Sequence, residues 1–386
     1  MTTMADNKDK KVLNVPHLRF PEFSGEWEKC KLGDIATGFD YGMNAAAKPF
    51  DGENKYIRIT DIDEASSTYI DKDIVSPDGT LTENYLVNDR DILLARTGAS
   101  TGKSYLYRKS DGKLYYAGFL IRANVTKHNP YFVFSQLHTH RYWSWVSIMS
   151  ARSGQPGINS QEYSSFPVYV TSLREEEKIS ALLSIIDERI ATQNKIIEDL
   201  KILKSAIAET VFNNMKGHLT NLSAICNIVK GKQVNGEELS EKGKYYVMNG
   251  GITPSGYYDQ YNTPANTISI SEGGNSCGYV QYNKSSFWSG GHCYTLQDIC
   301  SGVEPQYLFH YLKRYESNIM KLRIGTGLPN IQKKDLENFR IELPPSNVQK
   351  EIATCLTAIE HKILVEINWL DSVQKEKKHL LRQMFI

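Results

Sequence analysis

The sequence predicts a mixed α/β protein that contains two copies of one domain, each followed by a long helix. Three observations predict this fold class. The stretch Gly154–Ile158 recurs 173 positions later as Gly327–Ile331. Each copy ends in a run of about 40 residues whose apolar side chains recur at every third or fourth position. Inside each copy, short strand-like runs accompany one helical segment. We therefore expect a pseudo-twofold internal repeat.

The repeat extends along most of the chain. At the same offset the paired residues are Phe166 and Phe339, Ile179 and Ile352, Leu183 and Leu356, Ile186 and Ile359, Ile190 and Ile363, Ile207 and Leu380, and Phe212 and Phe385. Upstream the match needs small gaps, and Gly98 and Tyr107 then align with Gly273 and Tyr282. So long a period indicates a duplicated domain and not a solenoid. We predict a first domain at 1–172, a central helix at 173–217, a second domain at 218–345 and a final helix at 346–386.

The elements of the two domains follow from local patterns. In the first domain, strands are expected at Lys55–Thr60, Asp91–Arg96, Ser104–Arg108, Phe119–Val125 and Phe166–Val170, and one helix at Pro130–Met149, with proline in its first turn. In the second domain, strands are expected near Tyr245–Met248, Thr267–Ser271, Gly278–Tyr282 and Phe339–Leu343, and one helix at Pro305–Leu322.

Neither long helical stretch is interrupted by glycine or proline. A helix of about 40 residues is about 60 Å long at 1.5 Å per residue, and an apolar face of that length needs an equally long partner. We predict that the two helices pack on each other as an antiparallel coiled coil. The residues expected at this helix-pair and partner interface are Ile179, Leu183, Ile186, Ile190, Ile197, Leu200, Ile352, Leu356, Ile359, Ile363 and Leu370.

Composition and charge narrow the class of protein. The 386 residues include 23% charged and 11% aromatic residues, which is an ordinary globular composition. No run of about 18 apolar residues predicts a membrane span, so we expect a cytoplasmic protein that does not contact membranes. The net charge is +1. Autonomous nucleic-acid binders usually show a basic excess, so a DNA ligand would require partners that supply positive charge.

Several motifs that suggest catalysis are incomplete. Gly98–Ser104 resembles a phosphate-binding loop, but only three residues separate Gly98 from Gly102, and a strand follows where that loop requires a helix. A strand-turn-strand connection is favoured. Asn129-Pro130-Tyr131-Phe132 resembles the loop of adenine methyltransferases but lacks its second proline, so we interpret it as a helix start. The six cysteines show neither zinc spacing nor a disulfide framework, and no catalytic or metal-binding residues are predicted.

The chain resembles the specificity subunits of type I restriction-modification systems. Val15-Pro16-His17-Leu18-Arg19-Phe20-Pro21-Glu22-Phe23, followed by Trp27 and Lys31–Ile35, resembles the common opening of that family. Leu343-Pro344-Pro345, Gln349 and Ile352 resemble the start of its long helix, and Leu380–Phe385 resembles the end. The first copy departs from this pattern, because Val170-Thr171-Ser172 and Glu176 replace the prolines and the glutamine. This departure concerns only how the first helix begins, and the resemblance continues through Ile186–Ala191 and the rest of the helix.

The resemblance implies a DNA-binding subunit without catalytic activity or a cofactor of its own. Each domain would be a target-recognition domain that reads one half of a bipartite target in double-stranded DNA. The helices would set the spacing and dock two methyltransferase subunits, which use SAM. Motor-nuclease subunits, which use ATP and Mg, would join for cleavage. An orphan or phase-variable specificity subunit that directs methylation only is the alternative. Because the two copies differ in sequence, the target should be asymmetric.

The residues that contact DNA are expected in polar, glycine-rich loops, where long polar side chains reach base edges and phosphates. The candidates in the first domain are Lys48, Arg96, Ser100, Lys103, Tyr105, Arg152, Gln155 and Asn159. Those in the second domain are Lys230, Lys232, Asn249, Asn275, Tyr282, Lys284, Arg323, Thr326 and Asn330.

Overall fold

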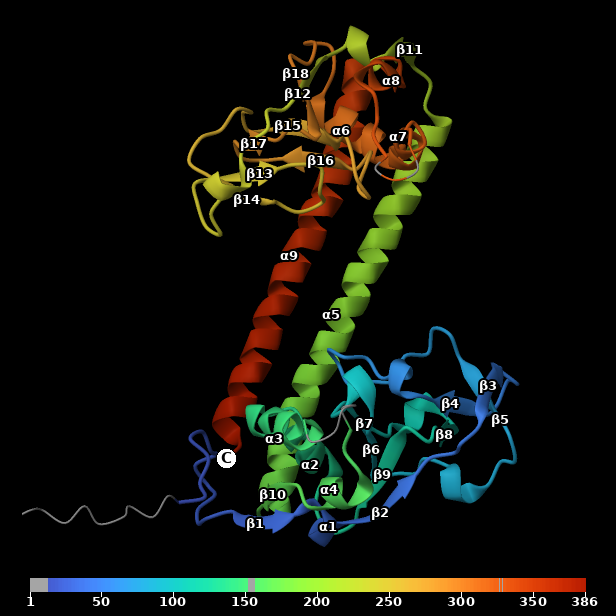
Figure 1. Cartoon of the computed structure of the whole chain (residues 1–386), viewed down its shortest axis with the longest axis vertical. Helices are drawn as coiled ribbons and strands as arrows, with labels where there is room; N and C mark the ends of the chain where they lie inside the picture. The colour runs from blue at the N-terminus through green and yellow to red at the C-terminus, as the bar shows by residue number, and fades with distance from the viewer. Residues whose placement is uncertain (1–12, 152–156, 326, 328) are drawn as a thin grey trace, which may run out of the picture. The chain divides into compact units, whose positions relative to one another are not determined.

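A computed structural model describes residues 13–151, 157–325, 327 and 329–386 (Figure 1). The chain forms two compact units. The first contains the residues up to Gln193 together with Trp369–Ile386, and the second contains Asn194–Asn368. The predicted division treated each long helix as a separate segment. In the structure both helices are divided between the units, because each half packs on the domain beside it.

The first unit is built on an antiparallel sheet of four strands in the order β2-β9-β6-β7. These strands are β2 (Ala36–Tyr41), β9 (Leu120–Val125), β6 (Asp91–Ala95) and β7 (Ser104–Leu106). Three two-stranded pairs accompany the sheet: β1 (Glu28–Lys31) with β10 (Pro167–Val170), β3 (Ala46–Pro49) with β5 (Val75–Asp78), and β4 (Lys55–Ile57) with β8 (Leu114–Tyr116). The short helices are α1 (Leu32–Ile35), α2 (Pro130–Gln136), α3 (His140–Ser150) and α4 (Ser160–Ser164), with 3-10 turns η1 (Ile59–Asp61), η2 (Glu83–Tyr85), η3 (Gly98–Ser100) and η4 (Lys109–Asp111).

The second unit repeats this plan with the strand order β12-β18-β15-β16. Its central strands are β12 (Asn227–Lys230), β18 (Cys293–Gln297), β15 (Thr267–Ser271) and β16 (Val280–Asn283). β14 (Gly256–Tyr258), β13 (Tyr245–Met248) and β17 (Trp288–Ser289) form a small sheet, and β11 (His218–Asn221) pairs with β19 (Arg340–Leu343). The short helices are α6 (Pro305–Arg314), α7 (Glu316–Met320) and α8 (Lys333–Glu337), with 3-10 turns η5 (Leu222–Ala224) and η6 (Gly236–Glu238). The repeated strand order confirms the predicted duplication.

The predicted single helix of each domain is wrong, and in the same way in both copies. In the first domain α2 ends at Gln136 and α3 begins at His140, where the Thr139 side chain accepts a hydrogen bond from the Tyr142 amide. In the second domain Tyr315 separates α6 from α7. Apolar periodicity continues across both breaks, so the sequence pattern alone does not reveal them.

The two long helices, α5 (Leu173–Asn214) and α9 (Ser346–Met384), run antiparallel within each unit. In the first unit Ile179 and Leu183 of α5 share a core with Leu381 and Met384 of α9. In the second unit the end of α5 packs against the start of α9. There, Phe212 of α5 lies in one core with the first apolar residues of α9. All eleven residues predicted for the helix-pair interface are buried or partly buried. The antiparallel pairing is confirmed.

The start of α5 keeps the geometry of the start of α9, although its sequence departs from the family pattern. Gln349 accepts a hydrogen bond from the Glu304 amide at 2.9 Å and donates to the Pro344 carbonyl at 2.9 Å. At the same place in the first copy, Glu176 accepts from the Asn129 amide at 2.9 Å and the Thr171 amide at 3.2 Å. The carboxylate replaces the amide as the group that ties the helix to the preceding strand. The departure in sequence therefore leaves both helix starts tied to the preceding strand.

Candidate nucleic-acid interface

Each four-stranded sheet carries the same turn between its last two strands. In the first domain the Gly102 amide donates to the Ala95 carbonyl at 3.0 Å, and in the second the Gly278 amide donates to Ser271 at 2.8 Å. Inside the turns, the Thr101 amide donates to Gly98 and the Cys277 amide to Gly274, both at 3.1 Å. The two turns therefore have the same length and the same hydrogen bonds, and Gly98 is equivalent to Gly274. The predicted match of Gly98 to Gly273 and of Tyr107 to Tyr282 is wrong by one position.

Glycine is required at the end of each turn. Gly102 and Gly278 both have φ of 92°, in the left-handed region. A Cβ atom on Gly102 would lie 2.7 Å from Cγ1 of Val146 in α3, and one on Gly278 would lie 2.8 Å from Cγ of Met320 in α7. The segment that resembles a phosphate-binding loop is thus a strand-turn-strand connection against a helix, as predicted.

We expect Gly278→Ala to destabilise the second unit by about 2–4 kcal/mol, since it combines left-handed strain with a clash against Met320. Gly274→Ala is the matched control, because Gly274 has φ of 76° but open space around its Cα. Its cost should be about 1 kcal/mol, from strain alone. Urea unfolding of the two variants measures both effects. Equal destabilisation would contradict the close approach of α7 to the turn.

A second loop in each domain lies against the turn. The Ile158 amide donates to the Arg96 carbonyl and the Ile331 amide to the Glu272 carbonyl, both at 2.9 Å. Thr97 forms an isolated bridge with Gly157, as Gly273 does with Asn330. The offset of 173 residues is therefore confirmed for this loop. The candidates Arg152, Gln155 and Thr326 lie outside the described residues, as do Gly154 and Leu328 of the repeated motif.

Several candidates of the first domain gather at this turn. The guanidinium of Arg96 lies over the ring of Tyr41, 4.6 Å from its centroid. Lys103 Nζ lies 3.5 Å from a carboxylate oxygen of Glu64. Asn159, which is exposed, caps α4 by accepting a hydrogen bond from the Glu162 amide at 2.9 Å. Ser100 is partly exposed within the turn itself.

Two candidates of the first domain lie elsewhere. Tyr105 is fully buried, and its hydroxyl donates to Asp111 Oδ2 at 2.7 Å. Burial raises the pKa of this hydroxyl well above its usual range. The prediction that Tyr105 contacts DNA is therefore wrong, because its ring is buried in a core with Leu93 and Tyr116. Lys48 is exposed on β3, which belongs to a different sheet from the turn.

The second domain places a network of charged side chains at the equivalent turn. Glu272 Oε1 accepts hydrogen bonds from Lys230 Nζ at 2.6 Å and from the Tyr294 hydroxyl at 3.2 Å. His292 Nδ1 lies 3.5 Å from Glu272 Oε2. The His292 amide donates to Asn249 Oδ1 at 3.1 Å. Burial, followed by the charge of Glu272, raises the pKa of Tyr294 to about 12, so that its hydroxyl remains a donor at neutral pH.

Sequence reasoning identified Lys230 and Asn249 in this network but missed Glu272 and His292. The candidate Asn330 meets the turn through its backbone bridge with Gly273. The sequence criterion for DNA contacts favoured cationic and amide side chains, so a carboxylate such as Glu272 was not a candidate. The repeat as aligned by sequence pairs Arg96 with Ser271, so only the backbone hydrogen bonds of the turn show that Glu272 is the residue equivalent to Arg96. Asn275 is exposed within the turn itself, whereas Lys232 and Arg323 are exposed in the same domain outside the turn.

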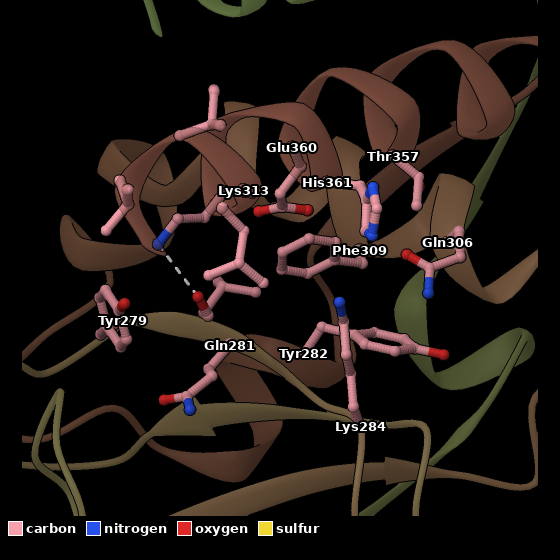
Figure 2. A pocket seen from close by; sticks show the side chains of 14 residues that line it. Tyr279, Gln281, Tyr282, Lys284, Gln306, Phe309, Lys313, Thr357, Glu360 and His361 are labelled. Carbon is pink, nitrogen blue, oxygen red and sulfur yellow. Dashed lines mark hydrogen bonds between the residues drawn. The ribbon is translucent and has the colours of Figure 1, made fainter. Parts of the chain in front are cut away.

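Tyr282 and Lys284 do not join this network, because they lie towards the opposite end of β16. Both line a groove of about 330 Å³ between β16, α6 and α9. Figure 2 shows Lys284 and Tyr282 across this groove from His361 and Glu360 of α9, with Phe309 of α6 between them. The Tyr282 ring packs on Phe309 with centroids 5.5 Å apart. The two predicted contacts therefore belong to a separate surface.

The described residues offer neither a metal site nor a membrane-spanning helix. There, no three His, Cys, Asp or Glu side chains converge in a way that would hold a metal ion. Within the same residues, no helix combines the length and apolar character needed to span a membrane.

Comparison with known proteins gives one consistent family. Residues 24–201 and 219–372 match the type I restriction modification DNA specificity domain. A putative type I specificity subunit of Mycoplasma genitalium is 33% identical over 164 residues, which span 40% of this chain and 42% of that protein. A putative specificity subunit of the MjaX type I restriction enzyme of Methanocaldococcus jannaschii is 24% identical and covers 95% of both chains. The crystal structure of a type I system S subunit from M. genitalium has a similar fold, with a TM-score of 0.71 at 19% identity over 96% of this chain and 99% of the other.

Proposed function

Because the chain belongs to the family of type I restriction-modification specificity subunits, we propose that it reads a bipartite, asymmetric DNA target for a methyltransferase complex. Each domain would recognise one half of the target, and α5 and α9 would set the spacing between the halves. This role needs no catalytic residue in the chain. SAM would be bound by two methyltransferase subunits, and ATP with Mg by motor-nuclease subunits in a complex that also cleaves.

One observation carries the proposal: the two domains share a turn of the same length and hydrogen bonding but present different side chains on it. The backbone hydrogen bonds of Arg96–Gly102 match those of Glu272–Gly278. Two related domains that recognise two different half-sites require a common backbone with different polar side chains. Direct readout depends on the side chains that reach base edges. A scaffold without a ligand has no need of this arrangement.

The long helices provide a surface that suits protein partners. Ile185, Ile202 and Leu203 of α5 are 62%, 61% and 48% exposed. Leu364 and Val365 of α9 are 46% and 44% exposed. Exposed apolar side chains along a helix are typical of docking surfaces. The net charge of +1 agrees with this role, because a neutral chain depends on partners for affinity to the phosphate backbone.

The proposal is tested by sequencing the methylated genome of a host that carries this gene and its methyltransferase partner, beside a strain that lacks only this gene. We expect methyladenine in both halves of one bipartite motif, and loss of that motif on deletion. The motif should not be a palindrome. An unchanged methylome with an active partner would contradict the proposal.

Cleavage of unmodified DNA separates the two forms of the complex. If the chain also serves restriction, hosts with the motor-nuclease subunit should cleave unmodified DNA only when this gene is present. Specific methylation without cleavage would identify a subunit that directs methylation only.

A further inference from the structure

Three positions around the turn are equivalent in the two domains but differ in chemistry. The Arg96 amide donates to the Phe119 carbonyl at 3.0 Å, and the Glu272 amide donates to the His292 carbonyl at 2.9 Å. Hence Arg96 corresponds to Glu272, and Phe119 to His292. In the neighbouring strands Tyr41 pairs with Ile121 of β9, as Lys230 pairs with Tyr294 of β18. Tyr41 therefore corresponds to Lys230.

The charge at this place is inverted between the domains. In the first domain the turn supplies the cation, Arg96, and the adjacent strand supplies the ring of Tyr41 below it, at 4.6 Å. In the second domain the turn supplies the carboxylate, Glu272, and the strand supplies the cation, Lys230, at 2.6 Å. Phe119 and His292 beside them are both exposed. Surfaces that bind only phosphate would keep the same sign of charge at the same position.

Contact with the Tyr41 ring restricts the Arg96 guanidinium to the face of that ring. A planar guanidinium offers paired N–H donors in a fixed fork, which suits the O6 and N7 acceptors of guanine in the major groove. Tyr41 is itself 42% exposed, so the stacked pair lies at the surface of the domain. Stacking reduces the loss of side-chain freedom when the donors meet a base.

One carboxylate oxygen of Glu272 accepts no hydrogen bond from the described residues. The residue is 8% exposed. Among the described residues its Oε1 receives the bonds of Lys230 and Tyr294, while its buried Oε2 accepts no hydrogen bond. The imidazole of His292, whose side chain is 63% exposed, lies beside this oxygen. Because a buried acceptor left without a donor costs free energy, a ligand that displaces the exposed ring and donates to Oε2 would be stabilised.

We propose that this shared position determines base preference in each half of the target: Arg96 recognises a guanine in one half, and Glu272 accepts a hydrogen bond from the N4 amino group of a cytosine in the other. Carboxylates repel phosphate, whereas the cytosine amino group is a donor that they bind in the major groove. The inference rests on the proposed function, since it identifies determinants within the two readers.

The test compares two conservative variants in the assembled methyltransferase complex. Arg96→Lys keeps the charge but removes the bidentate fork, and Glu272→Gln keeps the size and adds a donor that pairs with adenine N6 and N7. Arg108→Lys and Glu241→Gln are matched controls, because both residues are exposed and neither belongs to the turn. Methylation rates are measured on DNA duplexes that carry each of the four bases at every position of the motif.

We expect Arg96→Lys to reduce discrimination for guanine at one position of one half by about ten- to a hundredfold. Glu272→Gln should shift the preference at one position of the other half from cytosine towards adenine by a similar factor. Both controls should retain the parent preference. The unfolding temperature of each complex is measured beside the rates, because a folding defect slows methylation on every duplex whereas a change in readout alters one base position.

The inference fails if both variants keep every base preference of the parent complex, or if both alter the same half. It also fails if they slow methylation equally on all duplexes, because uniform weakening is the signature of phosphate contacts. These outcomes are distinct from failure of the proposed function, in which the parent complex itself would show no bipartite motif.

Discussion

Replacement of Trp27 by alanine is expected to destabilise the first unit by about 3–5 kcal/mol, the usual cost of removing a buried tryptophan. Trp27 is fully buried where the N-terminal segment meets α2 and α9. Its ring lies 5.3 Å from that of Phe132 and 6.1 Å from that of Phe385. Its indole N–H donates to Glu175 at 3.3 Å. The variant therefore loses packing with both elements and a hydrogen bond at the start of α5.

Urea unfolding followed by fluorescence and circular dichroism measures this change. Trp143→Ala is the control, since the Trp143 side chain is 44% exposed and its loss should have a much smaller effect. Equal stability of the Trp27 variant and the parent protein would show that the N-terminal segment does not pack on α9. Because α9 contributes to both units, we also expect the Trp27 variant to assemble poorly with a methyltransferase partner.

Arg19→Ala is expected to cost a comparable amount, about 3–5 kcal/mol, because it leaves a buried carboxylate without its cation. Arg19 Nε and Nη2 donate to the two oxygens of Glu175, each at 2.7 Å. The side chains are only 11% and 1% exposed. The guanidinium also donates to the carbonyls of Gly25, at 2.5 Å, and Ser24, at 3.1 Å. Loss of Arg19 therefore disrupts the N-terminal segment and leaves Glu175 underpaired.

A second ion pair joins the same two segments and provides a matched control. Lys178 of α5 pairs with Glu22, but both side chains are substantially exposed. Exposed pairs contribute little to stability, and salt weakens them further. We therefore expect Lys178→Ala to leave the unfolding midpoint nearly unchanged in the experiment that detects Arg19→Ala. If the two variants behaved alike, the buried pair would not fasten the N-terminal segment to α5.

Much of the fold could be predicted because it is encoded by local periodicity and by the repeat. The two long helices, the duplicated domain and strands such as Thr267–Ser271 follow from the spacing of apolar residues. The breaks at Thr139 and Tyr315 were missed, since an apolar pattern can continue through a change in helix direction. The register of the turn was misplaced by one residue, because Gly273 and Gly274 are adjacent and only backbone hydrogen bonds distinguish them.

The candidate site was predicted less completely, and the errors share one cause. Tyr105 and Arg96 are polar residues near the same turn, but one is fully buried and the other packs on an exposed ring. Glu272 belongs to the site because it contacts Lys230 and His292, which lie 42 and 20 positions away in the chain. No local pattern contains such pairs. They exist only when the strands that carry them are hydrogen-bonded side by side.

By itself the sequence determined the fold class, the duplication and the antiparallel helices, because these depend on the order and period of apolar residues. Only the tertiary structure decided which polar side chains meet at each turn, which of them are buried, and that equivalent positions carry opposite charges. The reason is physical: exposure and pairing are set by contacts between residues that are distant in the chain, and those contacts form only on folding.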